Sequence, residues 1–166
     1  MVGALVGILQ YRNGSMLNIA ANVVEKLVNI LPNSVGQPYV LDLVYSLSIV
    51  LSLHQVNIPI SCVTALNLIL LNLNYKSEKA IWEILQERKT VAHIVSNIHS
   101  GGMVPSEHFQ ELASLLSTIL WRWPPSRYPV WTDVKLMKTL EDIFAKPDLS
   151  VKVAVLKLYS ALGMKL

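Results

Sequence analysis

Apolar residues recur at three- and four-residue intervals along almost the whole chain. This spacing is the period of an α-helix, and the alternation of apolar and polar residues that is typical of a half-buried β-strand is not found. Prolines separate the apolar segments or fall in their first turns, where a helix tolerates them. Ser77 followed by Glu78, and Ser106 followed by Glu107 and Gln110, predict the starts of two helices. The pattern predicts an all-α protein.

A longer period links distant parts of the chain. An apolar segment, a short polar turn and a second apolar segment with a central alanine occur together, first around Ile8 and Ala20 and last around Ile143 and Ala154. Two looser pairs join residues 47–53 to Ala65 and residues 90–98 to Ala113. Successive alanines are 45, 48 and 41 residues apart, in or just beyond the period of about 40–47 residues of armadillo and HEAT repeats.

The repeated alanine has a physical reason. A small side chain lets two long helices approach closely where they cross, so we expect all four alanines to be buried. The repeat predicts a right-handed α-solenoid with about four armadillo-type repeats, of which the first is incomplete. We expect residues 1–166 to form a single domain. Because the repeat pattern is interrupted at both ends, we expect this domain to be a piece of a longer solenoid.

Composition leaves two explanations for the apolar character of these helices. The chain is 52% apolar and only 15% charged, against about 25% charged residues in typical soluble proteins. Such helices are either embedded in a membrane or buried on most faces. The longest apolar stretch, Ile58–Leu73, contains Pro59, Asn67 and Asn72, and falls short of the roughly 20 apolar residues of a spanning helix. The sequence therefore favours buried helices, and a membrane-associated protein stays an alternative.

Charge is unevenly distributed. The net charge is +3, and from Arg122 onward the chain has eight bases against four acids. This basic quarter keeps a nucleic-acid-associated helical repeat as a second alternative, although the rest of the chain offers little to a phosphate backbone. Cys62 is the single cysteine, as expected in a reducing compartment. With no basic leader before the first apolar run, we expect a cytoplasmic or nuclear location.

Four segments resemble one known family. They are LDLVYSLS at 41–48, EKAIWEILQERKTVAHIVSNI at 78–98, LLSTILWRWPPSRYPVW at 115–131 and KPDLSVKVAVLKLYSAL at 146–162. These segments resemble the armadillo-repeat region of plant BTB/POZ-domain proteins. The resemblance implies a protein-interaction scaffold with a protein partner. It further implies a link to the cullin-3 ubiquitin ligase, which would depend on a BTB domain that this sequence does not contain.

No residues form a catalytic or metal-binding set in the sequence. The histidines are His54, His93, His99 and His108, without the cysteines or paired carboxylates that would complete a metal site. Cys62 lies in an apolar helix, where a buried and unreactive thiol is normal. We therefore expect no enzyme activity, no cofactor and no small-molecule ligand.

The stretch from Trp121 to Trp131 is the strongest candidate for binding a partner. It combines three tryptophans, a tyrosine and two arginines, the residue types that dominate interface energetics. The alternative, which the sequence favours, is a proline-stiffened turn whose tryptophans pack between repeats. On that interpretation Trp121 is buried and Arg127 and Tyr128 are at the surface. The candidate partner-binding residues are Arg122, Trp123, Arg127 and Tyr128.

A polar stripe near the N-terminus is a further candidate. Asn18, Asn22, Glu25 and Asn29 share one helix face by their spacing. They line the concave surface of a solenoid or belong to a solvated face, and the second interpretation is favoured. In armadillo proteins that grip extended peptides, an asparagine lies six residues after the repeated small residue. Here those positions hold other residues, so such a peptide clamp is not expected; they are Lys26, Leu71, Ile119 and Ser160.

Overall fold

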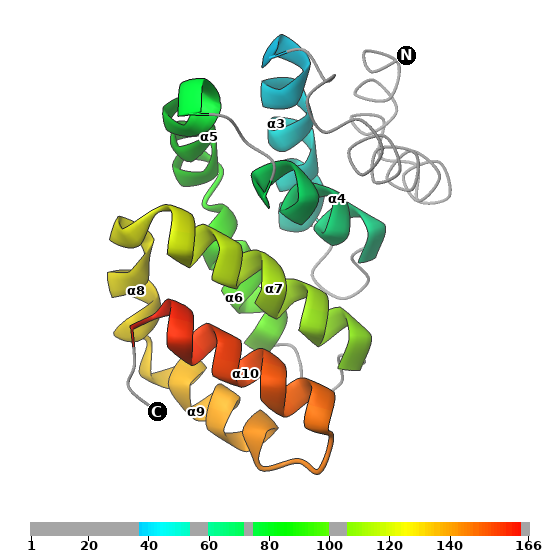
Figure 1. Ribbon diagram of the computed structural model, residues 1–166, viewed down its shortest axis with the longest axis vertical. Coiled ribbons are helices and arrows are strands. Elements are labelled where there is room, and N and C mark those ends of the chain that lie inside the picture. Colours follow the sequence, from blue (N-terminus) through cyan, green and yellow to red (C-terminus); the bar gives the residue numbers. More distant parts are fainter. Residues whose placement is uncertain (1–36, 54–59, 72–74, 100–105, 164–166) are drawn as a thin grey trace. The chain divides into compact units, whose positions relative to one another are not determined.

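The computed structural model describes residues 37–53, 60–71, 75–99 and 106–163, and every element in these ranges is helical (Figure 1). The elements are α3 (Gln37–Leu53), α4 (Ile60–Leu71), α5 (Tyr75–Glu87), α6 (Thr90–His99), α7 (Ser106–Arg122), the short 3-10 helix η2 (Pro124–Ser126), α8 (Arg127–Trp131), α9 (Val134–Phe144) and α10 (Leu149–Ala161). The predicted all-α class agrees with the described part of the chain.

The chain divides into two compact units, residues 1–90 and 91–166. The prediction of one continuous domain stays a prediction. In the first unit α3 packs against both α4 and α5. Helix α4 buries residues on more than one face, among them the consecutive residues Ala65, Leu66 and Asn67. This burial explains why α4 carries no charged residue, because a helix covered on several faces has little surface for charges.

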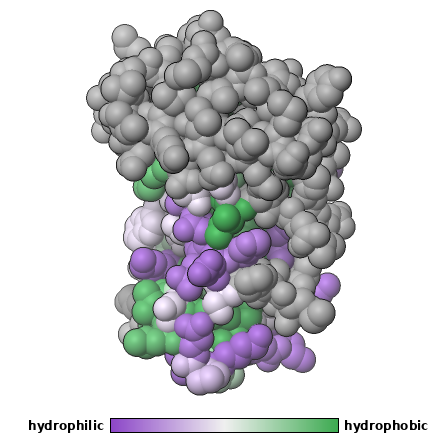
Figure 2. Space-filling view, turned by 90° about the vertical axis from the view of Figure 1, so that its right-hand side faces the viewer, coloured by the Kyte–Doolittle hydropathy of each residue, from purple (hydrophilic) through white to green (hydrophobic). Residues whose placement is uncertain are grey.

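In the second unit α10 packs most extensively against α7 and also against α9 (Figure 1). Helix α9 is amphipathic: its buried residues are Leu136, Leu140 and Ile143, which follow the i, i+4, i+7 spacing of one helix face. The opposite face of α9 is exposed. The described residues that are visible in Figure 2 are hydrophilic in some places and hydrophobic in others.

The alanines of the repeat are buried wherever the structure describes them. Ala65 in α4, Ala113 in α7 and Ala154 in α10 are 0%, 1% and 8% exposed. Ala20 lies outside the described residues. The helix pairs that the repeat predicted are also found, since α3 is followed by α4, α6 by α7 and α9 by α10.

Helix ends follow ordinary capping chemistry. Helix α7 begins at Ser106, as predicted, whereas α5 begins at Tyr75, two residues before the predicted Ser77. Asp133 caps α9, because its carboxylate accepts a hydrogen bond from the backbone N–H of Leu136 at 2.9 Å. Asp148 caps α10 in the same way, accepting from the N–H of Ser150 at 2.9 Å.

Burial determines the chemistry of the single cysteine. Cys62 has no exposed surface, and burial raises the pKa of its thiol from 9.0 to about 12. The predicted burial of Cys62 is confirmed, and the higher pKa leaves less of the reactive thiolate at neutral pH. Across the described segments, no helix has both the length and the apolar content that crossing a bilayer requires.

Candidate partner-binding surface

The segment Trp121–Val134 connects α7 to α9 through η2 and α8, and we call it the aromatic corner. Proline at the start of η2 ends the regular helix after Arg122. The turn is then closed by Ser126, whose N–H donates to the carbonyl of Trp123 at 2.9 Å and whose hydroxyl donates to the same oxygen at 2.6 Å. These bonds hold the backbone of the corner in one conformation.

The inner side of the aromatic corner is buried. Trp123, Ser126 and Val130 are 6%, 4% and 2% exposed. Trp123 follows Ile119 by four residues, so it continues the buried stripe of α7 by one turn, and its N–H donates to the carbonyl of Ile119 at 2.9 Å. Trp123, which the sequence proposed as a partner-binding residue, is therefore an inner residue of the corner.

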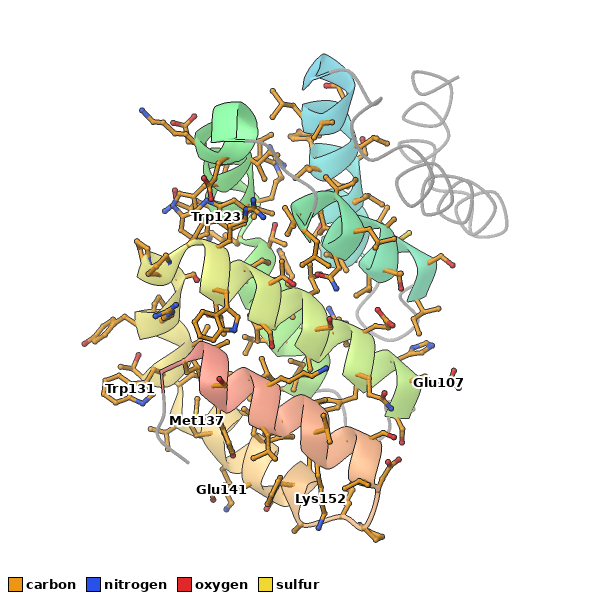
Figure 3. All side chains as sticks on the ribbon, in the orientation of Figure 1. Glu107, Trp123, Trp131, Met137, Glu141 and Lys152 are labelled. Carbon is orange, nitrogen blue, oxygen red and sulfur yellow. The ribbon has the colours of Figure 1, made fainter. Side chains whose placement is uncertain are left out.

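The outer side of the aromatic corner is exposed. Trp121, Tyr128 and Trp131 are 58%, 70% and 58% exposed, and Val134 is 81% exposed. Figure 3 shows Trp131 pointing away from α8. The prediction that Trp121 is buried is wrong. Trp121 follows Ala113 by eight residues, which turns it roughly 80° from that residue around the helix and off the packed face.

Arg127 lies against the C-terminal end of α7. Its guanidinium carbon lies 5.3 Å from the ring centroid of Trp121, within cation–π range. Its Nε–H donates to the backbone carbonyl of Leu120 at 2.9 Å. Arg127 and Arg122 are both half-buried, and Tyr128 is at the surface as predicted.

Val134 is a member of this surface that lies beyond the stretch proposed from the sequence, and Trp131 lies within that stretch but was not among its candidate partner-binding residues. The signal was present in α8, because Val130 is the apolar residue that faces inward and its neighbour Trp131 must then face outward. The other predicted set, Asn18, Asn22, Glu25 and Asn29, lies outside the described residues. Whether any of these residues binds a partner stays a prediction.

A hollow lies between α7 and α10. It has a volume of about 450 Å³ and is lined by Gln110, Glu111 and Ser114 from α7 and by Leu149, Val153 and Lys157 from α10. Its walls are of mixed polarity and carry both an acid and a base. A hollow with this lining favours neither an anionic nor a cationic ligand.

His99 resembles a catalytic group only superficially. Its Nδ1 lies 3.2 Å from the hydroxyl oxygen of Thr139, and its Nε2 lies 3.8 Å from a carboxylate oxygen of Asp133. The Thr139 hydroxyl, however, is 2.9 Å from the carbonyl of Lys135, to which it donates within α9. His99 thus fastens the end of α6 to α9. In the described residues, no group of three or more His, Cys, Asp and Glu side chains is placed to hold a metal ion.

Comparison with known proteins gives this helical arrangement its family. Residues 53–165 match the family model described as Plant ARM repeat. The chain belongs to the plant ARM repeat family. It is also 47% identical over 166 residues to a BTB/POZ domain-containing protein of Arabidopsis thaliana. That match covers 99% of this chain but 17% of the relative, so the chain spans about a sixth of that protein's length. No solved structure matches the chain.

The family confirms the predicted resemblance and the predicted α-solenoid of armadillo-type repeats. The short α8 followed by α9 and α10 gives the three helices of one armadillo unit. Armadillo repeats are scaffolds in which stacked helices form an extended surface.

Proposed function

We propose that this chain is the partner-recognition part of a BTB-type substrate adaptor for the cullin-3 ubiquitin ligase. In this proposal the ARM repeats bind a protein that is to be ubiquitinated, and a BTB domain in the longer protein contacts the ligase. The 47% identity to a BTB/POZ domain-containing protein supports this setting. The ARM repeat itself supports protein binding as the task of the chain.

The outer side of the aromatic corner is the observation that carries the proposal. Two tryptophans and a tyrosine are more than half exposed there, although such residues are usually buried for their large apolar area. A partner that covers them removes that area from water and gains affinity. The buried inner side keeps the same segment rigid, so little conformational freedom is lost on binding.

Nucleic-acid binding is the weaker alternative. The basic residues Lys135 and Lys138 of α9 are followed by the exposed acids Glu141 and Asp142 one turn later. Phosphate backbones require an uninterrupted track of bases, because affinity grows with the number of phosphates contacted. The mixed face of α9 does not provide such a track.

The proposal can be tested by capturing proteins on the chain and measuring their abundance in cells from which cullin-3 has been depleted. Proteins from plant cells are captured on the immobilised chain, and their abundance is compared in cells with and without cullin-3. We expect a set of captured proteins that accumulate when cullin-3 is depleted. Capture should survive nuclease treatment, which separates it from nucleic-acid binding.

Two results would contradict the proposal. In one, the captured proteins keep the same abundance after cullin-3 is depleted. The chain would then bind proteins without acting as a substrate adaptor of the ligase. In the other, capture disappears on nuclease treatment and falls steeply with salt, which would favour the nucleic-acid alternative.

A further inference from the structure

We propose that the outer side of the aromatic corner binds an acidic, partly apolar segment of a partner protein. A carboxylate of that segment pairs with the guanidinium of Arg127, and neighbouring apolar side chains cover Trp121, Tyr128 and Trp131. This inference rests on the proposed function and gives the chemistry of the partner that the scaffold recognises.

Charge around the corner has one dominant sign. The corner contains the bases Arg122 and Arg127 and the one acid Asp133, and Lys135 and Lys138 follow it in α9 before the acids Glu141 and Asp142. Asp133 is already engaged, because it caps α9 and lies 3.8 Å from His99. The corner therefore presents positive charge to a partner, and an acidic segment complements it.

Arg127 is held in place for a carboxylate. Its Nε–H is bonded to the carbonyl of Leu120 and its planar group lies over Trp121. The terminal amino groups of Arg127 make no hydrogen bond to any other residue that the structure describes. A guanidinium fixed at one N–H retains four donors, and its outer edge can pair with both oxygens of a carboxylate. Because Arg127 is already ordered, pairing costs less side-chain entropy than it would for a free arginine.

The aromatic residues supply the apolar part of the site. Tyr128 and Trp131 are three residues apart in α8, so their side chains leave the same side of that short helix. Trp and Tyr give a large contact area and have only two rotatable side-chain bonds, so they lose little entropy when a partner covers them. A purely acidic ligand would leave these rings exposed to solvent. The segment therefore needs apolar residues beside its carboxylates.

Two other occupants are possible in chemical terms, and the experiment separates them. Single-stranded nucleic acid also combines negative charge with flat apolar rings. A second copy of this chain could offer its own exposed acids, such as Glu141 and Asp142. The guanidinium of Arg127 can hold one carboxylate, whereas a phosphate backbone is held by many basic contacts in a row.

A displayed library of short random peptides, selected on the full chain, tests the inference. Binders are measured by fluorescence anisotropy, with an oligo-dT strand as the nucleic-acid probe. We expect selected peptides with Asp or Glu next to Leu, Phe or Trp. Replacing the acids of such a peptide with their amides, or testing Trp121→Ala or Arg127→Gln, should weaken binding about tenfold or more.

Two control variants make the test specific. Phe144 is the matched control, because its ring also contacts a cation: the Lys152 ammonium lies 5.4 Å from its centroid. This contact is at the other end of α9, so Phe144→Ala should leave peptide binding unchanged. Arg127→Lys keeps the charge but not the planar fork, so it should lose most of the affinity that Arg127→Gln loses. The unfolding midpoint of each variant is measured alongside, and only variants that fold like the wild type are compared.

Each other outcome overturns the inference. It is wrong if no acidic peptide is selected, if the selected peptides bind Trp121→Ala as tightly as the wild type, or if oligo-dT binds more tightly than any peptide. Concentration-dependent dimerisation abolished by Arg127→Gln would identify a second copy as the occupant instead. If the proteins captured for the cullin-3 test bind Trp121→Ala normally, this inference fails while the proposed function stands. If acidic peptides bind the corner but the abundance of no captured protein changes when cullin-3 is depleted, the proposed function fails while this inference stands.

Discussion

The inner and outer sides of the aromatic corner are made of the same residue types and have opposite environments. Trp123 is 6% exposed and Trp121 is 58% exposed, although they are two residues apart. Hydrophobicity does not distinguish them. The phase of α7 does, because Trp123 falls on the helix face that Leu116 and Ile119 already bury and Trp121 falls beside it. An aromatic residue out of phase with the core is therefore the better sign of a binding surface.

The largest effect should come from the inner side. Trp123→Ala removes a nearly fully buried ring and should lower the free energy of unfolding by about 3–5 kcal/mol. Guanidinium denaturation followed by circular dichroism measures this loss. Trp131→Ala, which truncates an exposed ring of the same corner, serves as the control and should cost less than about 1 kcal/mol. An equal decrease in the free energy of unfolding for the two variants would contradict the distinction between the inner and the outer side.

The two repeat alanines of the second unit should differ in the cost of a larger side chain. Ala113→Leu places three extra carbons at a site that is 1% exposed and should cost roughly 1–3 kcal/mol through overpacking. Ala154 is also buried but borders the hollow between α7 and α10, so Ala154→Leu can direct its side chain there and should cost less. A larger loss at Ala154 than at Ala113, measured by denaturation, would show that the hollow is closed in solution.

The first unit offers a pH-dependent effect. The Cys62 thiol has a pKa of 9.0 when unfolded and of about 12 when folded. Between these values the unfolded chain releases a proton that the folded chain keeps, so stability falls as pH rises. By pH 10 the loss should be about 1 kcal/mol relative to neutral pH. Cys62→Ala should lack this contribution, and identical pH profiles of the variant and the wild type between pH 8 and 10 would contradict it.

A smaller effect should come from the cap of α10. Asp148→Ala removes the acceptor for the N–H groups of Ser150 and Val151 and should cost about 1 kcal/mol. Asp142→Ala, at an exposed acid inside α9 that caps no helix end, is the control and should change stability by under about 0.5 kcal/mol. A thermal melt of both variants decides whether the cap accounts for the difference.

Much of the fold followed from the sequence. The helical period, the repeat of roughly 45 residues and the burial of Ala65, Ala113 and Ala154 were all readable from the spacing of apolar and small residues. The start of α5 was placed two residues late, because Ser77 can cap a helix and can equally lie in its first turn.

The site was less predictable because its residues break the helical pattern. Two prolines end α7 after Arg122. Beyond that point, the helical spacing of residues in the sequence no longer predicts which way their side chains face. Trp121 was assigned to the core because its spacing of eight residues from Ala113 and five from Leu116 was taken as close to the packed face, but that spacing turns it off the buried face, and it is 58% exposed. Arg127 could not be paired with Trp121 from sequence, since that contact depends on how η2 turns the chain back.

The most direct measurement is the unfolding free energy of Trp121→Ala. The central claim is that the outer side of the aromatic corner contributes little to the fold and is available to a partner. Because Trp121 is more than half exposed, its truncation should cost less than about 1 kcal/mol in guanidinium denaturation, including the lost contact with Arg127. A loss of about 3–5 kcal/mol, like that expected for Trp123→Ala, would show that Trp121 belongs to the core and would contradict the account.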